Sequence, residues 1–359
     1  MRISDLRTVM LSIPTEKTVA SNARSVNCVL VFLQTDEGVT GESLLATWGD
    51  KRLDLINSLV ASLKAGLLGE NPFYRERIWQ KVLGEIRSLG QMGLSRLAIS
   101  AIDRACWDIV GKATGKPLHH LLGACREEVP VYMSGFWPYQ SIEELTAEAR
   151  QSVKEGFRAM KMRIGRLPME EDVERVRAVR EAIGPEVDLM ADVNQRLNVE
   201  QAVRLGRRLE EFNLRWLEEP VPAHDLEGCA RVAAALDTPI AIGENESDRY
   251  GFRRILEMKA ADVLMPDLAR IGGFTEFLKV AHMAEAYDVP VSPHIYPEQS
   301  LQLMGSLPNA IYLEYMPWFS PLYLETIQIR NGKALLPQKP GIGFTFDPEA
   351  IERYRWEAR

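Results

Sequence analysis

The feature that most constrains this chain is a repeat of short apolar runs between residues 129 and 315, each followed by a polar segment with helical periodicity. Strands and helices that alternate at near-constant spacing are typical of parallel β/α units. Eight such units within about 200 residues match a compact TIM-type barrel of the α/β class. A doubly wound parallel sheet is the alternative architecture. The runs are 129–135, 159–164, 188–194, 215–220, 239–244, 263–267, 290–294 and 311–315.

The parts of the chain before and after this repeat are less regular. A Val-rich strand is expected at 26–33 and a helix at 95–115, for which Gly111 and Gly115 are candidate ends. A Pro- and Gly-rich run at 335–344 lies in the tail, which we expect to return to the N-terminal region. The sequence therefore predicts an N-terminal α+β domain (1–125), a barrel domain (126–316) and a C-terminal segment (317–359).

Composition excludes several classes of protein. A net charge of −7 argues against nucleic acid as a main partner, because phosphate binding needs a basic surface. No apolar run approaches the ~18 residues of a membrane span, and the first residues lack the pattern of a signal peptide. The cysteines lie far apart, without a C-x-x-C pair, and are expected to be reduced core thiols in the cytoplasm. They are Cys28, Cys106, Cys125 and Cys229.

Polar residues mark the ends of the apolar runs. In a TIM-type barrel the C-terminal ends of the strands converge on one mouth, where active sites lie. One such residue would be a helix cap or a surface charge, but a series in register is hard to explain by packing. Seven of the eight runs carry one: Lys161 with Arg163, Asp192 with Asn194, Glu218 with Glu219, Glu244, Asp267, His294 and Glu314.

Three acids in this series, Asp192, Glu218 and Glu244, come from consecutive runs. Carboxylates that meet at one mouth repel each other unless a cation binds them. Ligation by oxygen alone favours magnesium over zinc. Helix N-capping is the alternative role, since each acid precedes a helix, but it does not explain why the acids lie within apolar sequence. We therefore expect one Mg²⁺ in the active site.

The ordered set of motifs resembles the mandelate racemase subgroup of the enolase superfamily. This resemblance implies a modified (β/α)7β barrel with an N-terminal α+β capping domain that the C-terminal segment completes. It also implies abstraction of the proton next to a substrate carboxylate, and a homo-oligomer, either dimer or octamer. The motifs are K-M-R-I-G at 161–165, D-V-N-Q at 192–195, W-L-E-E-P at 216–220, G-E-N at 243–245, P-D-L-A-R-I-G-G at 266–273, S-P-H at 292–294 and L-E-Y at 313–315.

The chemistry assigns a role to each polar residue. Removal of a proton next to a carboxylate produces a dianionic enediolate, which magnesium stabilises electrostatically. His294 is the candidate base, and Asp267 would hold its other ring nitrogen. The resemblance gives Lys161 the role of contacting the substrate carboxylate. It makes Glu314 a hydrogen-bond donor to the enolate oxygen, which requires a protonated carboxyl.

Arg163 departs from the racemase pattern, which has a second lysine at this position. Arginine stays protonated, so it is a poor base, and one remaining base suits elimination rather than inversion. The predicted reaction is the dehydration of an acid sugar, either an aldonate or an aldarate, to a 2-keto-3-deoxy acid. The alternatives are a racemase or epimerase of a 2-hydroxy acid and, from another class, a catalytically silent relative that binds a metal and an acid. Cycloisomerases resemble the chain less, because they carry a lysine where this chain has Asp267.

Two N-terminal segments are candidates for capping the barrel mouth. The segment 15–27 is polar, which suits a polyhydroxylated acid, although a solvated loop would have the same composition. The segment 43–50 contributes a tryptophan. The predicted substrate-binding residues are Arg24, Trp48 and Asn194.

Overall fold

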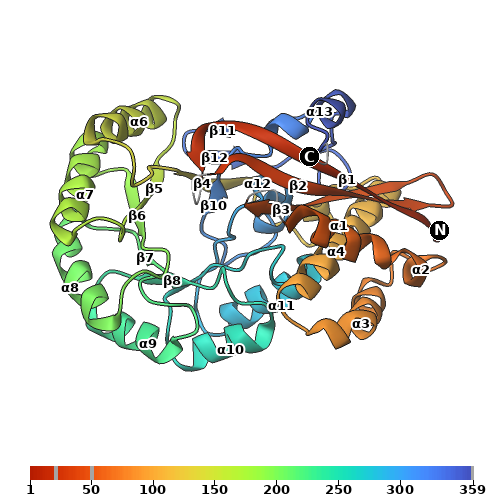
Figure 1. The fold of residues 1–359 in the computed structure, drawn as a ribbon, viewed down its shortest axis with the longest axis horizontal. Coiled ribbons are helices and arrows are strands. Elements are labelled where there is room, and N and C mark those ends of the chain that lie inside the picture. Colours follow the sequence, from red (N-terminus) through yellow and green to blue (C-terminus); the bar gives the residue numbers. More distant parts are fainter. Residues whose placement is uncertain (20–22, 49–51, 357–359) are drawn as a thin grey trace.

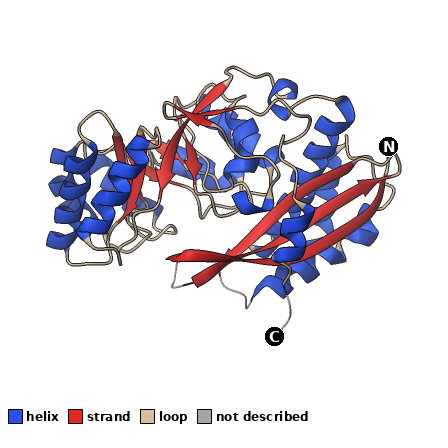
Figure 2. Ribbon diagram, turned by 90° about the horizontal axis from the view of Figure 1, so that it is seen from above, coloured by secondary structure: helices blue, strands red, loops and turns tan. Residues whose placement is uncertain are grey.

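The computed structural model describes residues 1–19, 23–48 and 52–356, with the side chains of all but 16–19, 23 and 48. The chain begins with an antiparallel three-stranded sheet of order β1-β2-β3, against which helices pack on one face (Figures 1 and 2). Its elements are β1 (Ile3–Val19), β2 (Ala23–Thr35), β3 (Thr40–Trp48), α1 (Leu53–Ser62), α2 (Lys64–Leu67), α3 (Arg75–Ile86), a 3₁₀ turn (Arg87–Leu89), α4 (Leu94–Thr114) and α5 (Leu118–Leu121).

Two details of this region differ from the sequence prediction. The segment 15–27 is not a loop for most of its length, because β1 runs to Val19 and β2 begins at Ala23. Helix α4 passes through Gly111 and ends at Gly115, which adopts the left-handed conformation. Gly111 has a packing role instead, since a Cβ there would lie 2.5 Å from the Cα of Gly341 in the C-terminal segment.

The second part is a closed barrel, which confirms the TIM-type prediction and excludes the doubly wound sheet. Parallel pairing runs from β4 through β9, and β10 pairs with β4. Bridges from Leu264 to Val291 and from Asp267 to His294 place the segment 291–294 as the seventh strand. The strands are β4 (Glu128–Ser134), β5 (Ala159–Arg163), β6 (Asp188–Asp192), β7 (Leu217–Glu218), β8 (Ile240–Ile242), β9 (Val263–Leu264) and β10 (Leu313–Tyr315).

A helix follows each of the first seven strand positions and none follows β10 before the chain leaves the barrel, which is the (β/α)7β order. Figure 1 shows α6 to α10 as an arc around the strands, with α11 towards the N-terminal domain. These helices are α6 (Ile142–Lys154), α7 (Met169–Ile183), α8 (Val199–Leu209, followed by a 3₁₀ turn, Glu210–Phe212), α9 (Leu226–Ala235), α10 (Arg249–Glu257), α11 (Phe274–Glu285) and α12 (Pro297–Met304).

The remaining residues tie the barrel to the N-terminal domain. Strand β12 pairs antiparallel with β4, and Arg355 bridges Leu11 at the edge of β1. The N-terminal domain also contacts the barrel directly, because Trp79 Nε1 of α3 donates to the Gly272 carbonyl at 2.9 Å. We propose domain boundaries near residues 125 and 316. The C-terminal elements are a 3₁₀ turn (Ser320–Leu322), β11 (Ile329–Arg330), β12 (Lys333–Leu335) and α13 (Pro348–Arg353).

The barrel interior has two layers, because side chains two residues apart on a strand point to the same side. The lower set, here called the apolar layer, consists of Tyr132, Ala159, Met190, Trp216, Ala241, Val263 and Met265. The upper set, here called the charged layer, lies two residues further along these strands and includes the end of the seventh strand. It consists of Lys161, Asp192, Glu218, Asp267, His294 and Glu314.

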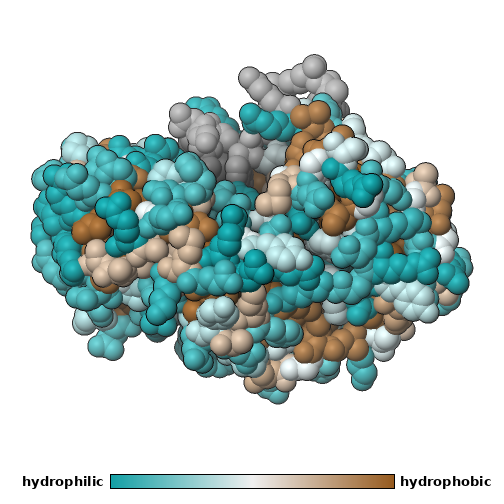
Figure 3. Space-filling view, turned by 90° about the horizontal axis from the view of Figure 1, so that it is seen from below, coloured by the Kyte–Doolittle hydropathy of each residue, from teal (hydrophilic) through white to brown (hydrophobic). Residues whose placement is uncertain are grey.

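Two expectations about the surface can be compared with the structure. None of the described helices combines the length and apolar composition of a membrane span. The face drawn in Figure 3 is mostly hydrophilic, with hydrophobic side chains in separate patches. All four cysteines are free, and three are buried as expected, but Cys125 is exposed.

Candidate active site at the barrel mouth

The three predicted metal ligands lie at the ends of adjacent strands. Asp192 ends β6 and pairs in register with Glu218, which ends β7, and Glu244 lies two residues beyond β8. Their exposed fractions are 1%, 0% and 8%. Burial is the main cause that raises the pKa of Asp192, and burial together with the neighbouring acids raises the pKa of Glu218 to about 8. Repulsion from the neighbouring acids thus adds to the effect of burial at Glu218.

The donor chemistry of this cluster fits a hard divalent cation. Every candidate ligand is a carboxylate oxygen, and a bound cation would stabilise the ionised form of these buried acids. The described side chains do not, however, gather three His, Cys, Asp or Glu groups into an assembled metal site. Glu218 and Glu244 face protein cations, and Asp192 accepts from the amide of Asn194 at 2.9 Å. Metal binding would require these oxygens to turn from their present partners.

Lys161 lies between two of the acids. Its Nζ is 2.6 Å from Glu218 Oε1 and 3.0 Å from Glu314 Oε1, and the side chain is fully buried. Burial opposes the charge, but the two carboxylates hold the pKa of Lys161 well above its usual range. Lys161 is therefore a fixed cation at the floor of the site, and one lysine charge balances only one of its two partners.

Glu314 is the second partner, and its contacts favour an ionised carboxyl, whereas the sequence predicted a protonated one. Its Oε1 accepts from Ser134 Oγ at 2.6 Å, and its Oε2 accepts from the backbone N–H of Ile295 at 2.8 Å. Burial opposes the charge, but Lys161, His294 and Arg163 hold the pKa of Glu314 well below its usual range. With both oxygens accepting, Glu314 acts here as an acceptor and not as a donor.

His294 and Asp267 form a pair on neighbouring strands. His294 Nδ1 is 2.6 Å from Asp267 Oδ2, and Asp267 Oδ1 accepts from the backbone N–H groups of Ala269 and Arg270, each at 2.8 Å. The other ring nitrogen, Nε2, is 3.4 Å from Glu244 Oε2. Burial opposes the charged imidazolium, but Glu244 and Asp267 raise the pKa of His294 to about 9.

Arg163 donates hydrogen bonds to groups of β4 and of the loop after it, and its Nη2 lies 4.0 Å from Glu314 Oε1. Its Nη1 donates to Ser134 Oγ at 3.0 Å and to the Gly135 carbonyl at 3.1 Å. The guanidinium lies 4.5 Å from the centroid of the Trp137 ring. Arg163 thus links Ser134 to an aromatic wall, which agrees with an orienting role rather than a role as a base.

A cleft of about 90 Å³ opens above the charged layer. Trp137 and Trp318, from loops after β4 and β10, stack with ring centroids 6.3 Å apart and form one wall. The sequence analysis did not predict either tryptophan, because loop residues follow no periodic pattern. It did not predict Ser134 either, because serines are common at strand ends. The cleft is lined by Trp137, Arg163, Arg166, Asp192, Asn194, Glu244, Arg270, His294, Ile295, Met316 and Trp318.

The three predicted substrate-binding residues differ in their position relative to the cleft. Asn194 lines the cleft. Arg24 is exposed near the start of β2 and is not among the residues that line this cleft. The side chain of Trp48 lies outside the described part of the chain.

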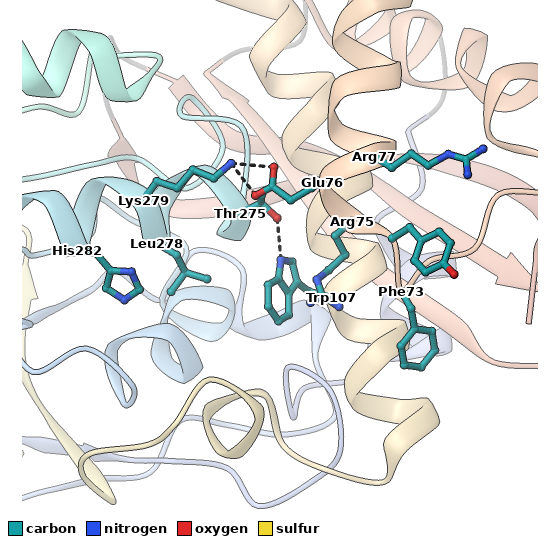
Figure 4. A pocket seen from close by; sticks show the side chains of 10 residues that line it. Phe73, Arg75, Glu76, Arg77, Trp107, Thr275, Leu278, Lys279 and His282 are labelled. Atoms are coloured by element: carbon teal, nitrogen blue, oxygen red, sulfur yellow. Dashed lines mark hydrogen bonds and ion pairs between the residues drawn. The ribbon is translucent and has the colours of Figure 1, made fainter.

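A second hollow lies away from the barrel mouth, between α3 and α4 of the N-terminal domain and α11 of the barrel (Figure 4). It is larger, about 450 Å³. Arg75 lies 3.7 Å from the Trp107 ring centroid, and Trp107 Nε1 donates to Thr275 Oγ1 at 3.0 Å. Glu76 pairs with Lys279 across it. These contacts join the two domains, and none of the predicted site residues lines this hollow.

Two family models match the chain. One, described as Enolase C-terminal domain-like, matches residues 144–350. The other describes the N-terminal domain of mandelate racemase / muconate lactonizing enzyme and matches residues 5–123. Between them they span both structural parts described above.

Individual relatives agree with these models. L-Talarate/galactarate dehydratase of Salmonella typhimurium is 39% identical over 285 residues, which cover 79% of this chain and 72% of that enzyme. D-Galactarolactone cycloisomerase of Agrobacterium fabrum is 34% identical over 350 residues, with 91% of each chain covered. The crystal structure of L-talarate dehydratase from Polaromonas sp. JS666, complexed with Mg and L-glucarate, has a TM-score of 0.92 at 33% identity and covers 99% of this chain and 98% of that one.

Proposed function

The chain belongs to the mandelate racemase / muconate lactonizing enzyme family of the enolase superfamily, and from this premise we propose that it is a magnesium-dependent dehydratase of acid sugars. The observation that carries the proposal is the arrangement of bases around the cleft. His294, oriented by Asp267, is the candidate base beside the cleft, because an arginine, as at position 163, is a poor proton acceptor. One base suits elimination of water, whereas inversion requires a second base on the opposite face.

The roles follow from the positions of the side chains. Lys161, at the floor of the site, would contact one oxygen of the substrate carboxylate and lower the cost of the developing negative charge. Mg²⁺ held by Asp192, Glu218 and Glu244 would supply the main positive charge against the enediolate. Glu314, ionised and held by Ser134 and Ile295, would keep Lys161 charged and in place.

His294 would perform both proton transfers. Its Nε2 takes the proton from C2 as the C2–H bond breaks, and then gives it to the C3 hydroxyl as the C3–O bond breaks. Water leaves, and the resulting enol tautomerises to the 2-keto-3-deoxy acid. A base must be neutral, yet Glu244 contributes to the raised pKa of His294. That contribution diminishes once the charge of Glu244 is balanced in the loaded site.

The test is a screen of mono- and diacid sugars, including their lactones, with the purified protein and Mg²⁺. We expect 2-keto acid to form from at least one acid, EDTA to abolish its formation and Mg²⁺ to restore it. Turnover that persists after rigorous chelation would contradict the metal assignment. Exchange of the C2 proton with deuterium, with inversion and no keto acid, would favour the racemase alternative. Conversion of a lactone without water loss would favour a cycloisomerase. Metal binding without any turnover would favour a catalytically silent relative.

Location and assembly are also proposals. The free state of all four cysteines supports a reducing compartment, and we propose the cytoplasm. We propose a homo-oligomer, a dimer or an octamer, which light scattering of the purified protein would test.

A further inference from the structure

We infer that the preferred substrates are diacid sugars, in which Arg166 binds the carboxylate at the far end of the molecule from the reacting carbons. This inference rests on the proposed function and names its substrate class. It concerns the single chemical difference between an aldarate and an aldonate, which is a carboxylate in place of a terminal CH₂OH group.

The position of Arg166 carries the inference. It follows β5 in the loop before α7 and lines the same cleft as Asp192, Glu244 and His294, at its exposed rim. A substrate whose first carboxylate reaches the charged layer would therefore extend its other end towards this rim.

The other cations of the cleft already have partners. Arg270 Nη1 lies 3.2 Å from Glu244 Oε1, and His294 is paired with Asp267. Arg163 donates to Ser134 and Gly135. Within the described residues, Arg166 has neither a hydrogen bond nor an ion pair from its guanidinium.

The charge around Arg166 is also unbalanced. Partial burial and then the like charges of Arg196 and Arg163 lower its pKa. Three guanidinium groups thus influence one another, and the carboxylate of Asp192 acts on Arg166 in the opposite direction. Unpaired arginines at the rim of a cleft attract anions, and a guanidinium fork matches a carboxylate in bidentate geometry. A neutral CH₂OH group would leave this charge unbalanced.

Arg166 could instead be a solvated surface arginine that binds no ligand. A comparison of matched substrates distinguishes this alternative from the proposed carboxylate site. Each hexarate, such as galactarate, is assayed beside its hexonate counterpart, such as galactonate, with the unmodified enzyme and with Arg166→Gln and Arg166→Lys. Arg150→Gln, which removes an exposed arginine of α6 that does not line the cleft, is the control.

A hydrogen bond to a charged group is worth about 1.5–3 kcal/mol, which corresponds to a preference of about 10- to 150-fold in kcat/KM for the hexarate. We expect Arg166→Gln to remove most of this preference, mainly through KM, Arg166→Lys to retain part of it, and Arg150→Gln to leave both substrates unaffected. An unmodified enzyme that uses hexonates as well as hexarates, or an unchanged preference in Arg166→Gln, would overturn the inference.

Calorimetry keeps the inference testable if no acid is turned over. With Mg²⁺ present, hexarates should bind the unmodified protein more tightly than hexonates, and Arg166→Gln should weaken hexarate binding selectively. Selective binding without turnover would refute the dehydratase proposal and leave the diacid site standing. Turnover without a preference for hexarates would support the dehydratase proposal and refute the diacid site.

Discussion

The apolar layer and the charged layer of the barrel interior lie on the same strands, two residues apart. Met190 precedes Asp192 on β6, and Trp216 precedes Glu218 at β7. Both layers are buried almost completely. In the lower layer Trp216 and Tyr132 pack edge to face, with centroids 5.5 Å apart, whereas the upper layer concentrates acids whose pKa values burial raises. Two residues along a strand therefore separate side chains whose packing stabilises the fold from buried acids whose burial costs stability.

The largest effect should come from the charged layer. His294→Asn keeps the approximate volume and removes the base, so we expect kcat to fall by about 10²–10⁴-fold with a largely unchanged melting temperature. Exchange of the C2 proton with deuterium should disappear together with water loss, because one residue performs both transfers. If exchange continues at the normal rate, another base acts on C2, Lys161 becomes the suspect and the single-base mechanism is wrong.

The matched change in the apolar layer should act on stability instead. Met190→Ala deletes a side chain with no exposed surface, and such cavities cost about 2–5 kcal/mol of unfolding free energy. Urea denaturation should show this loss, while kcat of the folded fraction changes far less than in His294→Asn. A variant with normal stability but lost turnover would show that the two layers do not divide their roles in this way.

The next effect concerns pH in the protein stripped of metal and is smaller over any single pH unit. The folded-state pKa of Glu218 is raised from 4.5 to about 8, so the folded protein holds this proton more tightly than the unfolded chain does. The free energy of unfolding should therefore fall as pH rises from about 4.5 to about 8, by at most about 1.4 kcal/mol per unit. Denaturation at several pH values should give a shallower fall for Glu218→Gln. Equal slopes would mean that Lys161 keeps Glu218 ionised throughout.

The smallest effect is expected at the boundary of the charged layer. Arg163→Lys keeps the charge but loses the fork that reaches both Ser134 and Gly135, so dehydration should continue at a reduced rate. A lysine there can lose its proton, and slow inversion at C2 should become detectable by deuterium incorporation. Inversion by the unmodified enzyme would contradict the non-basic role of Arg163.

Much of the charged layer could be predicted, because the period of a strand and the shared direction of barrel strands fix where an acid at a strand end must point. The pairing of Asp267 with His294 followed from this rule together with the role that an acid has in other His–Asp pairs. Loops have no such period, so the stacked Trp137 and Trp318 could not be foreseen. The charge on Glu314 could not be foreseen either, because it depends on the Ser134 hydroxyl and on the Ile295 amide, which a sequence pattern does not place.

The return of the C-terminal segment has a consequence for synthesis of the chain. Ser12 of β1 donates its backbone N–H to the Tyr354 carbonyl at 2.8 Å, and Trp356 donates to the Met10 carbonyl at 2.9 Å. Near Gly111, the Ile342 backbone N–H reaches Asp108 of α4 at 2.9 Å. During translation, residues 10–12 of β1 therefore have no partner on this edge until residues 354–356 have been made. An unpaired edge can pair with other nascent chains, so slow translation ahead of residues 354–356, or truncation before them, should favour aggregation and increase dependence on chaperones.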